Sequence, residues 1–80
     1  MIRMKYIMTR YSPIVFSDAL NHRDVSSGWE VTSAGFVSVE WNEEEKKFNC
    51  VPYGESVSLG LKPDTEDKLK LERMFNGGYS

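Results

Sequence analysis

The sequence predicts an α+β fold in which a small antiparallel sheet of about four strands carries a C-terminal helix. Two patterns lead to this prediction. Apolar and polar residues alternate along several segments of the chain, a spacing typical of half-buried strands. Near the C-terminus the apolar residues instead recur every three or four positions, a spacing typical of an amphipathic helix. A length of 80 residues predicts a single domain over residues 1–80.

The predicted strands follow one another along the chain. Residues 4–11 mix β-branched, aromatic and polar residues and predict a first strand, and residues 14–16 form a short extended segment. Residues 36–41 alternate, with Val37, Val39 and Trp41 on one face, and a charged turn joins them to a partner strand over residues 48–53. Apolar residues alternate with small ones over residues 57–61 and predict a further strand.

Two helices complete the predicted fold. A serine followed by aspartate, alanine and leucine predicts a short capped helix near residues 17–24. A second helix is expected near residues 64–76, because acidic residues just after Pro63 favour the positive end of a helix dipole. Glycines at 77 and 78 would end it. Its apolar stripe consists of Leu71, Met74 and Phe75.

Charge and hydropathy narrow the class of protein. Ten lysines and arginines against twelve acidic residues give a net charge of -2, so the chain lacks the overall basic character that favours nucleic-acid binding. A local basic patch of Arg3, Lys5 and Arg10 remains an alternative. The longest apolar run covers only residues 13–16, too short for a signal peptide or a membrane helix. With its lone cysteine, the chain is therefore expected in the cytoplasm, with no membrane partner.

Catalytic and metal chemistry find little support in the residues. One cysteine and one histidine exclude an internal disulfide, a multi-cysteine zinc site and any site that needs two imidazoles. Cys50 lies within a predicted strand, where a free cysteine usually serves as a small buried apolar residue. No Gly-x-Ser-x-Gly motif is present, and the acidic runs at 43–45 and 64–67 match no calcium loop. The sequence therefore predicts a protein that is not an enzyme and uses no cofactor or metal.

Six residues make up a candidate site for a small anionic or nucleotide ligand. His22 is either a base or phosphate donor in this site or a helix-end histidine whose ring bonds a backbone carbonyl. Arg10 and Arg23 would supply positive charge. Three hydroxyl groups would supply hydrogen bonds near closely approachable backbone, namely those of Ser33, Ser56 and Ser58. No glycine-rich phosphate loop accompanies these residues, so they form a collection of groups rather than a motif.

Aromatic residues exceed what so small a core can bury. A chain of this length buries only roughly 60% of the surface that its unfolded form exposes, and 12% of its residues are aromatic. The surplus predicts an interface, and self-association as a homodimer or higher oligomer is the expected one. A protein partner is the alternative. Its recognition surface would consist of Trp29, Trp41, Glu43, Glu44 and Glu45.

Three stretches of the chain also resemble a family. They are PIVFSDALNHRDV at 13–25, TSAGFV at 32–37 and YGESVSLGL at 53–61, the last followed by Pro63 and acidic residues. These stretches are similar to short proteins of unknown activity that tailed phages and prophages encode. The resemblance implies a bacterial host cytoplasm and a small accessory protein. Compact oligomers in that setting commonly either sequester a small host molecule, such as a nucleotide signal, or bind and block a host protein.

Three functions follow, all based on binding. The leading hypothesis is a non-enzymatic, phage-type accessory protein that acts as a homo-oligomer and sequesters a small anionic or nucleotide ligand. The alternative is a protein-interaction module that binds and blocks a host protein. The third is nucleic-acid binding through the basic patch at the N-terminus.

Overall fold

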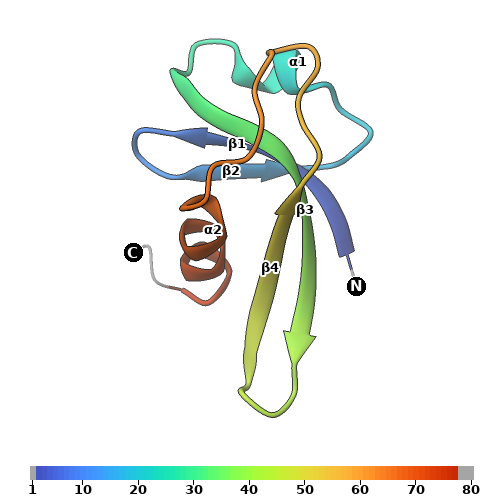
Figure 1. The fold of residues 1–80 in the computed structure, drawn as a ribbon, viewed down its shortest axis with the longest axis vertical. Helices are drawn as coiled ribbons and strands as arrows, with labels where there is room; N and C mark the ends of the chain where they lie inside the picture. Colours follow the sequence, from blue (N-terminus) through green and yellow to red (C-terminus); the bar gives the residue numbers. More distant parts are fainter. Residues whose placement is uncertain (1, 78–80) are drawn as a thin grey trace.

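The sheet consists of two hairpins, and in Figure 1 the first runs across the view while the second runs down it. The computed structural model describes residues 2–77. The first hairpin pairs β1 (Ile2–Thr9) with β2 (Pro13–Phe16), and the second pairs β3 (Val31–Asn42) with β4 (Lys47–Tyr53). An antiparallel pairing of β1 with β3 joins them, so the strand order is β2-β1-β3-β4.

Two helices accompany the sheet: α1 (His22–Ser26) follows β2, and α2 (Asp67–Phe75) lies near the C-terminus. The predicted α+β fold, with a four-stranded antiparallel sheet, a short helix after the second strand and a C-terminal helix, is confirmed. Neither helix of residues 2–77 has the length and apolar character that crossing a membrane requires. The predicted stop at Gly77 agrees with its positive φ of 82°, and Gly78 lies outside the described residues.

The short helix begins later than the sequence predicted. The segment expected to be helical from residue 17 starts instead with a turn, in which Leu20 N–H donates to Ser17 O over 3.1 Å. The helix begins at His22 because the side chain of Asn21 accepts a hydrogen bond from Arg23 N–H and caps it. Both serine and asparagine are good capping residues, but the Ser17 hydroxyl accepts a hydrogen bond from Ala19 N–H within the turn and does not cap a helix.

The strand predicted over residues 57–61 is wrong, because this segment forms a tight turn. Ser56 and Leu61 face each other as an isolated bridge, and Ser56 N–H donates to Leu61 O over 2.7 Å. Gly60 has a φ of +67°, which lets the chain reverse direction. The alternating apolar residues reflect the turn itself: Leu59 packs on the sheet, whereas Val57 is 83% exposed.

The core has two layers, one on each face of the sheet. Helix α2 covers one face, where Leu71 is fully buried against β1, β3 and β4. Helix α1 and the turn 56–61 cover part of the other face. The buried residues of the first layer are Tyr6, Met8, Val37, Val39, Cys50 and Leu71, and those of the second are Ile7, Phe16 and Ala34.

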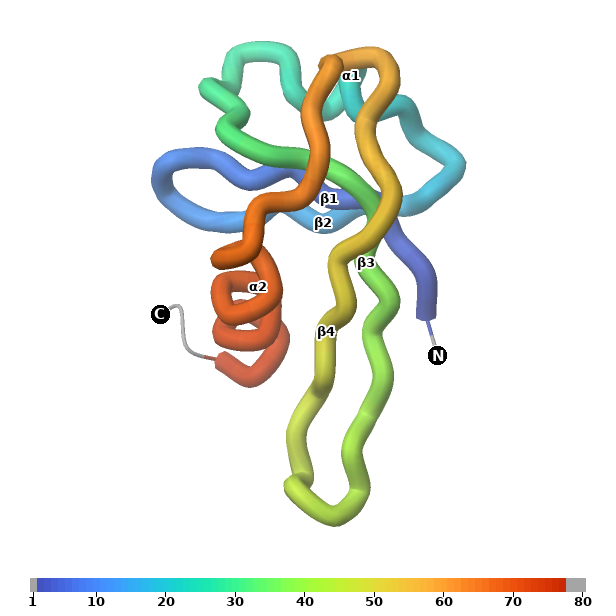
Figure 2. The backbone as a smooth tube through the Cα atoms, in the orientation of Figure 1, coloured from blue at the N-terminus to red at the C-terminus, as the bar shows by residue number. Residues whose placement is uncertain are grey.

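The second hairpin extends past the first and makes the molecule elongated. The pairing of β1 with β3 ends at the pair Ile2 and Val39, so the residues of β3 beyond Val39 are paired only with β4. We call residues 40–49 the hairpin arm. The arm forms the narrow end of a molecule whose extents are 37 × 24 × 20 Å, and the tube in Figure 2 shows it projecting beyond α2.

Gly35 is the point where the segment leading into α2 crosses the sheet closely. A Cβ atom added here would meet Pro63 Cγ at 2.8 Å and Tyr53 O at 2.9 Å. We therefore expect Gly35→Ala to lower the free energy of unfolding by about 1–3 kcal/mol, as overpacking does. Gly60→Ala meets no atom within 4 Å and should lose only about 1 kcal/mol, from its positive φ. Urea denaturation measures both, and equal stability of Gly35→Ala and wild type would contradict this account of the crossing.

Candidate functional site

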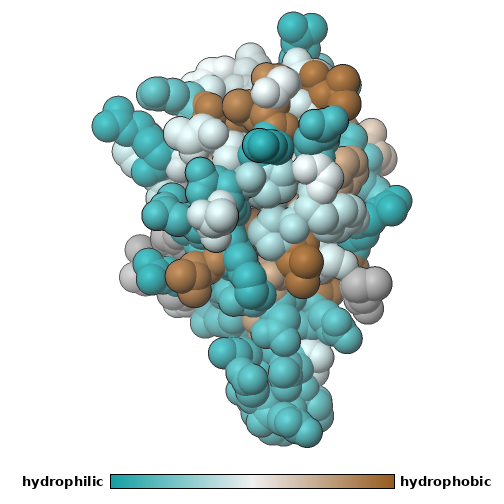
Figure 3. All heavy atoms as spheres, in the orientation of Figure 1, coloured by the Kyte–Doolittle hydropathy of each residue, from teal (hydrophilic) through white to brown (hydrophobic). Residues whose placement is uncertain are grey.

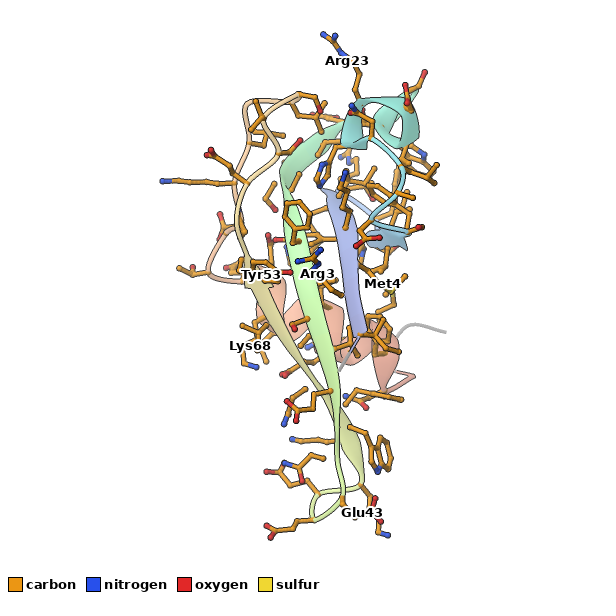
Figure 4. All side chains as sticks on the ribbon, turned by 90° about the vertical axis from the view of Figure 1, so that its right-hand side faces the viewer. Arg3, Met4, Arg23, Glu43, Tyr53 and Lys68 are labelled. Atoms are coloured by element: carbon orange, nitrogen blue, oxygen red, sulfur yellow. The ribbon has the colours of Figure 1, made fainter. Side chains whose placement is uncertain are left out.

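The two sets of sequence-predicted residues lie mainly at opposite ends of the molecule. Figure 4 labels Arg23 at one end and Glu43 at the other. The first end consists of α1 and the turn 56–61, and the second is the tip of the hairpin arm. Most residues proposed for a small ligand therefore lie far from the acidic tip proposed for a protein partner.

His22 is a structural residue. Its ring is buried, with 4% of the residue exposed, and Nε2–H donates to Gly35 O over 2.8 Å. The ring also meets Phe16 and Phe36 edge-on, at centroid distances of 5.5 and 5.9 Å. These contacts match the structural alternative for this histidine, in which the ring bonds a backbone carbonyl at a helix end.

Ser33 belongs to a buried network that centres on Asp67. The carboxylate of Asp67 is 1% exposed and accepts hydrogen bonds from Ser33 Oγ at 2.7 and 2.9 Å and from Tyr6 Oη at 2.6 Å. Burial raises the pKa of Tyr6 above its ordinary value, and the hydrogen bond to Asp67 raises it further, so the phenol stays a neutral donor. The network joins the start of α2 to both central strands.

Asp67 also fixes the turn that leads into α2, together with Asp64. Its Oδ2 accepts a hydrogen bond from Asp64 N–H over 2.9 Å, while Asp64 Oδ1 accepts one from Glu66 N–H over 3.2 Å. Both bonds lie in the turn before α2, and the cap residue of the helix, Glu66, makes no side-chain capping hydrogen bond. The helix dipole alone had explained these acidic residues from the sequence. No local pattern showed that Asp67 reaches Tyr6 and Ser33.

The hydroxyls at the first end of the molecule are bonded within the chain. Ser56 is 1% exposed and its Oγ accepts a hydrogen bond from Leu59 N–H over 3.3 Å. Ser58 is exposed and donates to the Asn21 side chain over 2.9 Å. Asn21, which the sequence did not single out, thus links the turn 56–61 to α1.

The six candidate ligand residues are only partly brought together. Arg23 and Ser58 both bond Asn21 and share the exposed surface at that end. Arg10 lies in the turn between β1 and β2, where its guanidinium is 5.7 Å from the ring of Tyr11. The remaining three are buried and bonded inside the chain, namely His22, Ser33 and Ser56.

The basic patch of the third hypothesis is similarly divided. Arg3 and Lys5 point to one face of β1, as alternation predicted. Arg3 lies 3.6 Å from Asp18, and Lys5 Nζ donates to Leu20 O over 2.7 Å. Both cations are therefore directed toward the segment after β2, while Arg10 lies in the β1–β2 turn.

Trp41 is exposed and yet held in place on the hairpin arm. It is 47% exposed. Its Nε1–H donates to Glu43 over 2.7 Å, and its ring meets Phe48 edge-on at 4.9 Å. The rings of Phe48 and Phe75 of α2 pack with their centroids 6.1 Å apart, which connects the indole to the core. A large aromatic surface is thus presented in a fixed orientation.

The tip of the arm is acidic and its charges are exposed. Glu43 pairs with Lys46 at 3.2 Å, and Glu45 pairs with Lys47 at 2.8 Å. Glu44 has no ion pair among residues 2–77. The narrow end of the molecule is accordingly hydrophilic in the space-filling view of Figure 3.

Trp29 does not share this surface. It precedes β3, whereas Trp41 lies near the end of the same 12-residue strand. The two tryptophans have equal exposure, 47% each, and stand at opposite ends of β3. The predicted recognition surface is therefore two surfaces, of which the one with Trp41 also holds the three glutamates.

Cys50 is a buried thiol of β4. Burial, and then the Glu72 carboxylate, raise its pKa to about 11 against a smaller opposing effect of Lys68. Among the residues that the structure describes, no group of three or more histidines, cysteines and acids is placed to hold a metal ion. In comparisons with protein-family models, curated proteins and solved structures, no match to this chain was found.

The Asp67 network supplies a first prediction for this region. Tyr6→Phe and Ser33→Ala each remove one donor to a buried carboxylate, so each should lower the free energy of unfolding by about 1–3 kcal/mol. Because both donors serve one acceptor, the double variant should deviate from additivity by at least about 0.5 kcal/mol. Urea denaturation of the four proteins gives this coupling, and strict additivity would show that the two bonds do not form one network.

The raised pKa values of Cys50 and Tyr6 supply a second prediction. The folded chain holds these protons more tightly than the unfolded chain, so stability is fully present below the unfolded pKa values and falls as pH rises. We expect the loss of stability to begin near pH 9 with the Cys50 thiol, whose pKa is about 11 when folded.

Iodoacetamide should label Cys50 far more slowly in the native protein at pH 8 than in urea. Equal labelling rates would contradict the burial of this thiol.

Proposed function

We propose that this protein acts by binding, as an interaction module whose hairpin arm contacts a protein partner. The observation that carries the proposal is Trp41, a half-exposed indole fixed by Glu43 and Phe48 at the narrow end of the molecule. Tryptophan is enriched among residues that dominate binding energy at protein interfaces. A side chain that is already ordered loses little conformational entropy on binding, so its buried area converts more fully into affinity.

The charge of the arm indicates the chemistry of the partner. Residues 40–47 contain four glutamates and two lysines, and two of the glutamates are paired with those lysines. The net negative tip favours a partner with a basic surface around an apolar pocket. Complementary charge of this kind mainly raises the association rate and is screened by salt.

The alternative ligand function has fewer residues left to support it. His22, Ser33 and Ser56 use their side chains in hydrogen bonds that hold the fold together. A small anion would therefore depend on Arg23 and Ser58 alone at the α1 end. The arm, by contrast, offers an aromatic group and charges whose burial by a partner would leave the fold intact.

The setting of this binding is a further part of the proposal. The resemblance to small phage-encoded proteins supports a partner from a bacterial host and a location in the host cytoplasm. On this proposal the arm would occupy a functional surface of the host protein.

The experiment compares two tryptophan variants that are matched in exposure. Tagged wild-type protein, Trp41→Ala and Trp29→Ala are used as baits in bacterial lysate, and captured proteins are quantified by mass spectrometry. A protein bound through the arm should be captured by wild type and by Trp29→Ala. Trp41→Ala is expected to lose about 2 kcal/mol of binding free energy, which corresponds to roughly 30-fold weaker binding. Glu44→Lys should also weaken capture, and added salt should weaken capture by wild type.

Each control is chosen to separate binding from folding. Both tryptophans are equally exposed, and circular dichroism verifies that both variants are folded. Glu30→Lys is the control for Glu44→Lys, because Glu30 is also exposed but lies beside Trp29. Equal losses for Trp29→Ala and Trp41→Ala, or undiminished capture by Trp41→Ala, would contradict a role for the arm.

A further inference from the structure

Helix α2 occupies the free edge of the sheet as a fifth strand would. The carboxamide of Asn76 makes two hydrogen bonds with the backbone of Phe48: Phe48 N–H donates to Oδ1 over 2.8 Å, and Nδ2–H donates to Phe48 O over 3.1 Å. A residue on a neighbouring antiparallel strand bonds its partner in the same reciprocal way. The side chain of Asn76 thus reproduces one peptide group of an absent strand.

A charged pair likewise bonds the backbone of Cys50, the next residue of β4 whose N–H and C=O point away from β3. Cys50 N–H donates to Glu72 Oε2 over 2.9 Å, and Lys68 Nζ donates to Cys50 O over 2.9 Å. Lys68 and Glu72 also pair with each other at 2.7 Å. Burial alone would raise the pKa of Glu72, but its hydrogen bonds with Lys68 and the Cys50 amide outweigh burial and lower it.

The spacing of Glu72 and Asn76 matches the spacing of Cys50 and Phe48, the two strand residues that they bond. Lys68, Glu72 and Asn76 are four residues apart, so they lie on one side of the helix about 6 Å from each other along its axis. Two residues of a strand span about 6.7 Å. Figure 4 shows Lys68 beside β4, where the helix runs antiparallel to the strand. We call these three side chains the edge clasp.

We propose that the edge of β4 is a strand-addition site that α2 keeps closed, and that it receives β4 of a second copy of this chain when α2 lifts away. The clasp is bordered by a shallow groove of about 330 Å³ whose lining includes Glu72 and Asn76. The bonds between Asn76 and Phe48 are exposed, and those at Cys50 are half-buried. An unpaired strand edge is a template for another strand, and proteins commonly cover such edges.

The shape of the edge selects a second copy as the occupant. In β4 the backbone groups of Phe48, Cys50 and Pro52 point to the edge, away from β3, and Pro52 has no N–H to donate. Phe48 and Cys50 therefore each offer an N–H and a C=O at the edge. When β4 pairs antiparallel with β4 of a second copy, Phe48 lies opposite Cys50 of that copy, and all of these groups are hydrogen-bonded. This register is two-fold symmetric about Asn49, as a closed dimer requires.

The side chains also agree with this register. Lys47 would face Val51 of the other copy, and Asn49 would face its own equivalent, so no like charges are opposed. The other edge of the sheet is less suited, because β2 has four residues and begins with Pro13. The inference goes beyond the proposed function, because the edge and the tip of the arm are separate surfaces.

The first experiment removes the clasp and measures the oligomeric state. In Lys68→Ala/Glu72→Ala/Asn76→Ala the edge bonds are lost while alanine maintains the helix. Light scattering after size exclusion should give a monomer for wild type and twice its mass for the variant. The matched control, Glu66→Ala/Lys70→Ala/Arg73→Ala, changes three residues of α2 and its cap that do not bond β4, and should stay monomeric.

The second experiment determines the register of the dimer. Asn49→Cys, added to the clasp variant, should form an intermolecular disulfide, because the two positions face each other at the two-fold axis. Val51→Cys is the control, since its two copies would be about 13 Å apart along the strands, beyond the roughly 7 Å that a disulfide spans. Cross-linking through Val51→Cys, or none through Asn49→Cys, would overturn the proposed pairing.

A third measurement uses wild type and does not depend on how the variants fold. The amides of Phe48 and Cys50 should exchange with solvent when α2 lifts, together with the amides of α2 itself. The amides of Asn49 and Val51 face β3 and should be protected at least about tenfold more strongly. Equal protection of both sets, or a monomeric clasp variant, would overturn the proposal without affecting the role of Trp41.

Discussion

The buried carboxylate of Asp67 fixes the arrangement on which the other features depend. It accepts hydrogen bonds from Tyr6 of β1 and from Ser33 of β3, two residues that are distant in sequence from the helix. The same carboxylate accepts a hydrogen bond from Asp64 N–H and so fixes the turn that leads into α2. A buried charge is tolerated only when its hydrogen bonds are made, and no buried side-chain polar atom of residues 2–77 lacks a partner. The position of α2 on the sheet is therefore tightly constrained at its N-terminus.

From that point the helix performs two tasks with two of its sides. Leu71 and Phe75 fill the core layer over the sheet. The residues of the edge clasp face β4 and complete the hydrogen bonds that a four-stranded sheet leaves open. Because α2 ends beside Phe48, the sheet beyond that residue projects alone as the hairpin arm (Figure 1). The fold thus leaves one long element exposed, and it is the one that carries Trp41.

The sequence contained enough information for the sheet and its helices but not for the contacts between them. Alternation identified the two long strands of the second hairpin, because one side of each is buried. The same alternation was misleading over 57–61, where Gly60 reverses the chain and both Leu59 and Leu61 pack on the sheet. Ser33 and Asp67 are 34 residues apart, and no local pattern shows that they meet. Whether a polar residue lies on the surface or is buried and hydrogen-bonded was consequently the feature that the sequence predicted least well.

Phe48 connects the two surfaces that we propose for binding. Its ring supports Trp41 on one side and contacts Phe75 of α2 on the other, while its backbone is bonded by Asn76. If α2 lifts from the edge, Phe48 loses its contact with Phe75, which loosens the packing behind Trp41 while the bond to Glu43 remains. Binding of a partner at Trp41 and pairing of β4 with a second copy would then oppose each other, and by linkage each would weaken the other by the same factor. On these two proposals, a monomer with a closed edge would be the form competent to bind through the arm.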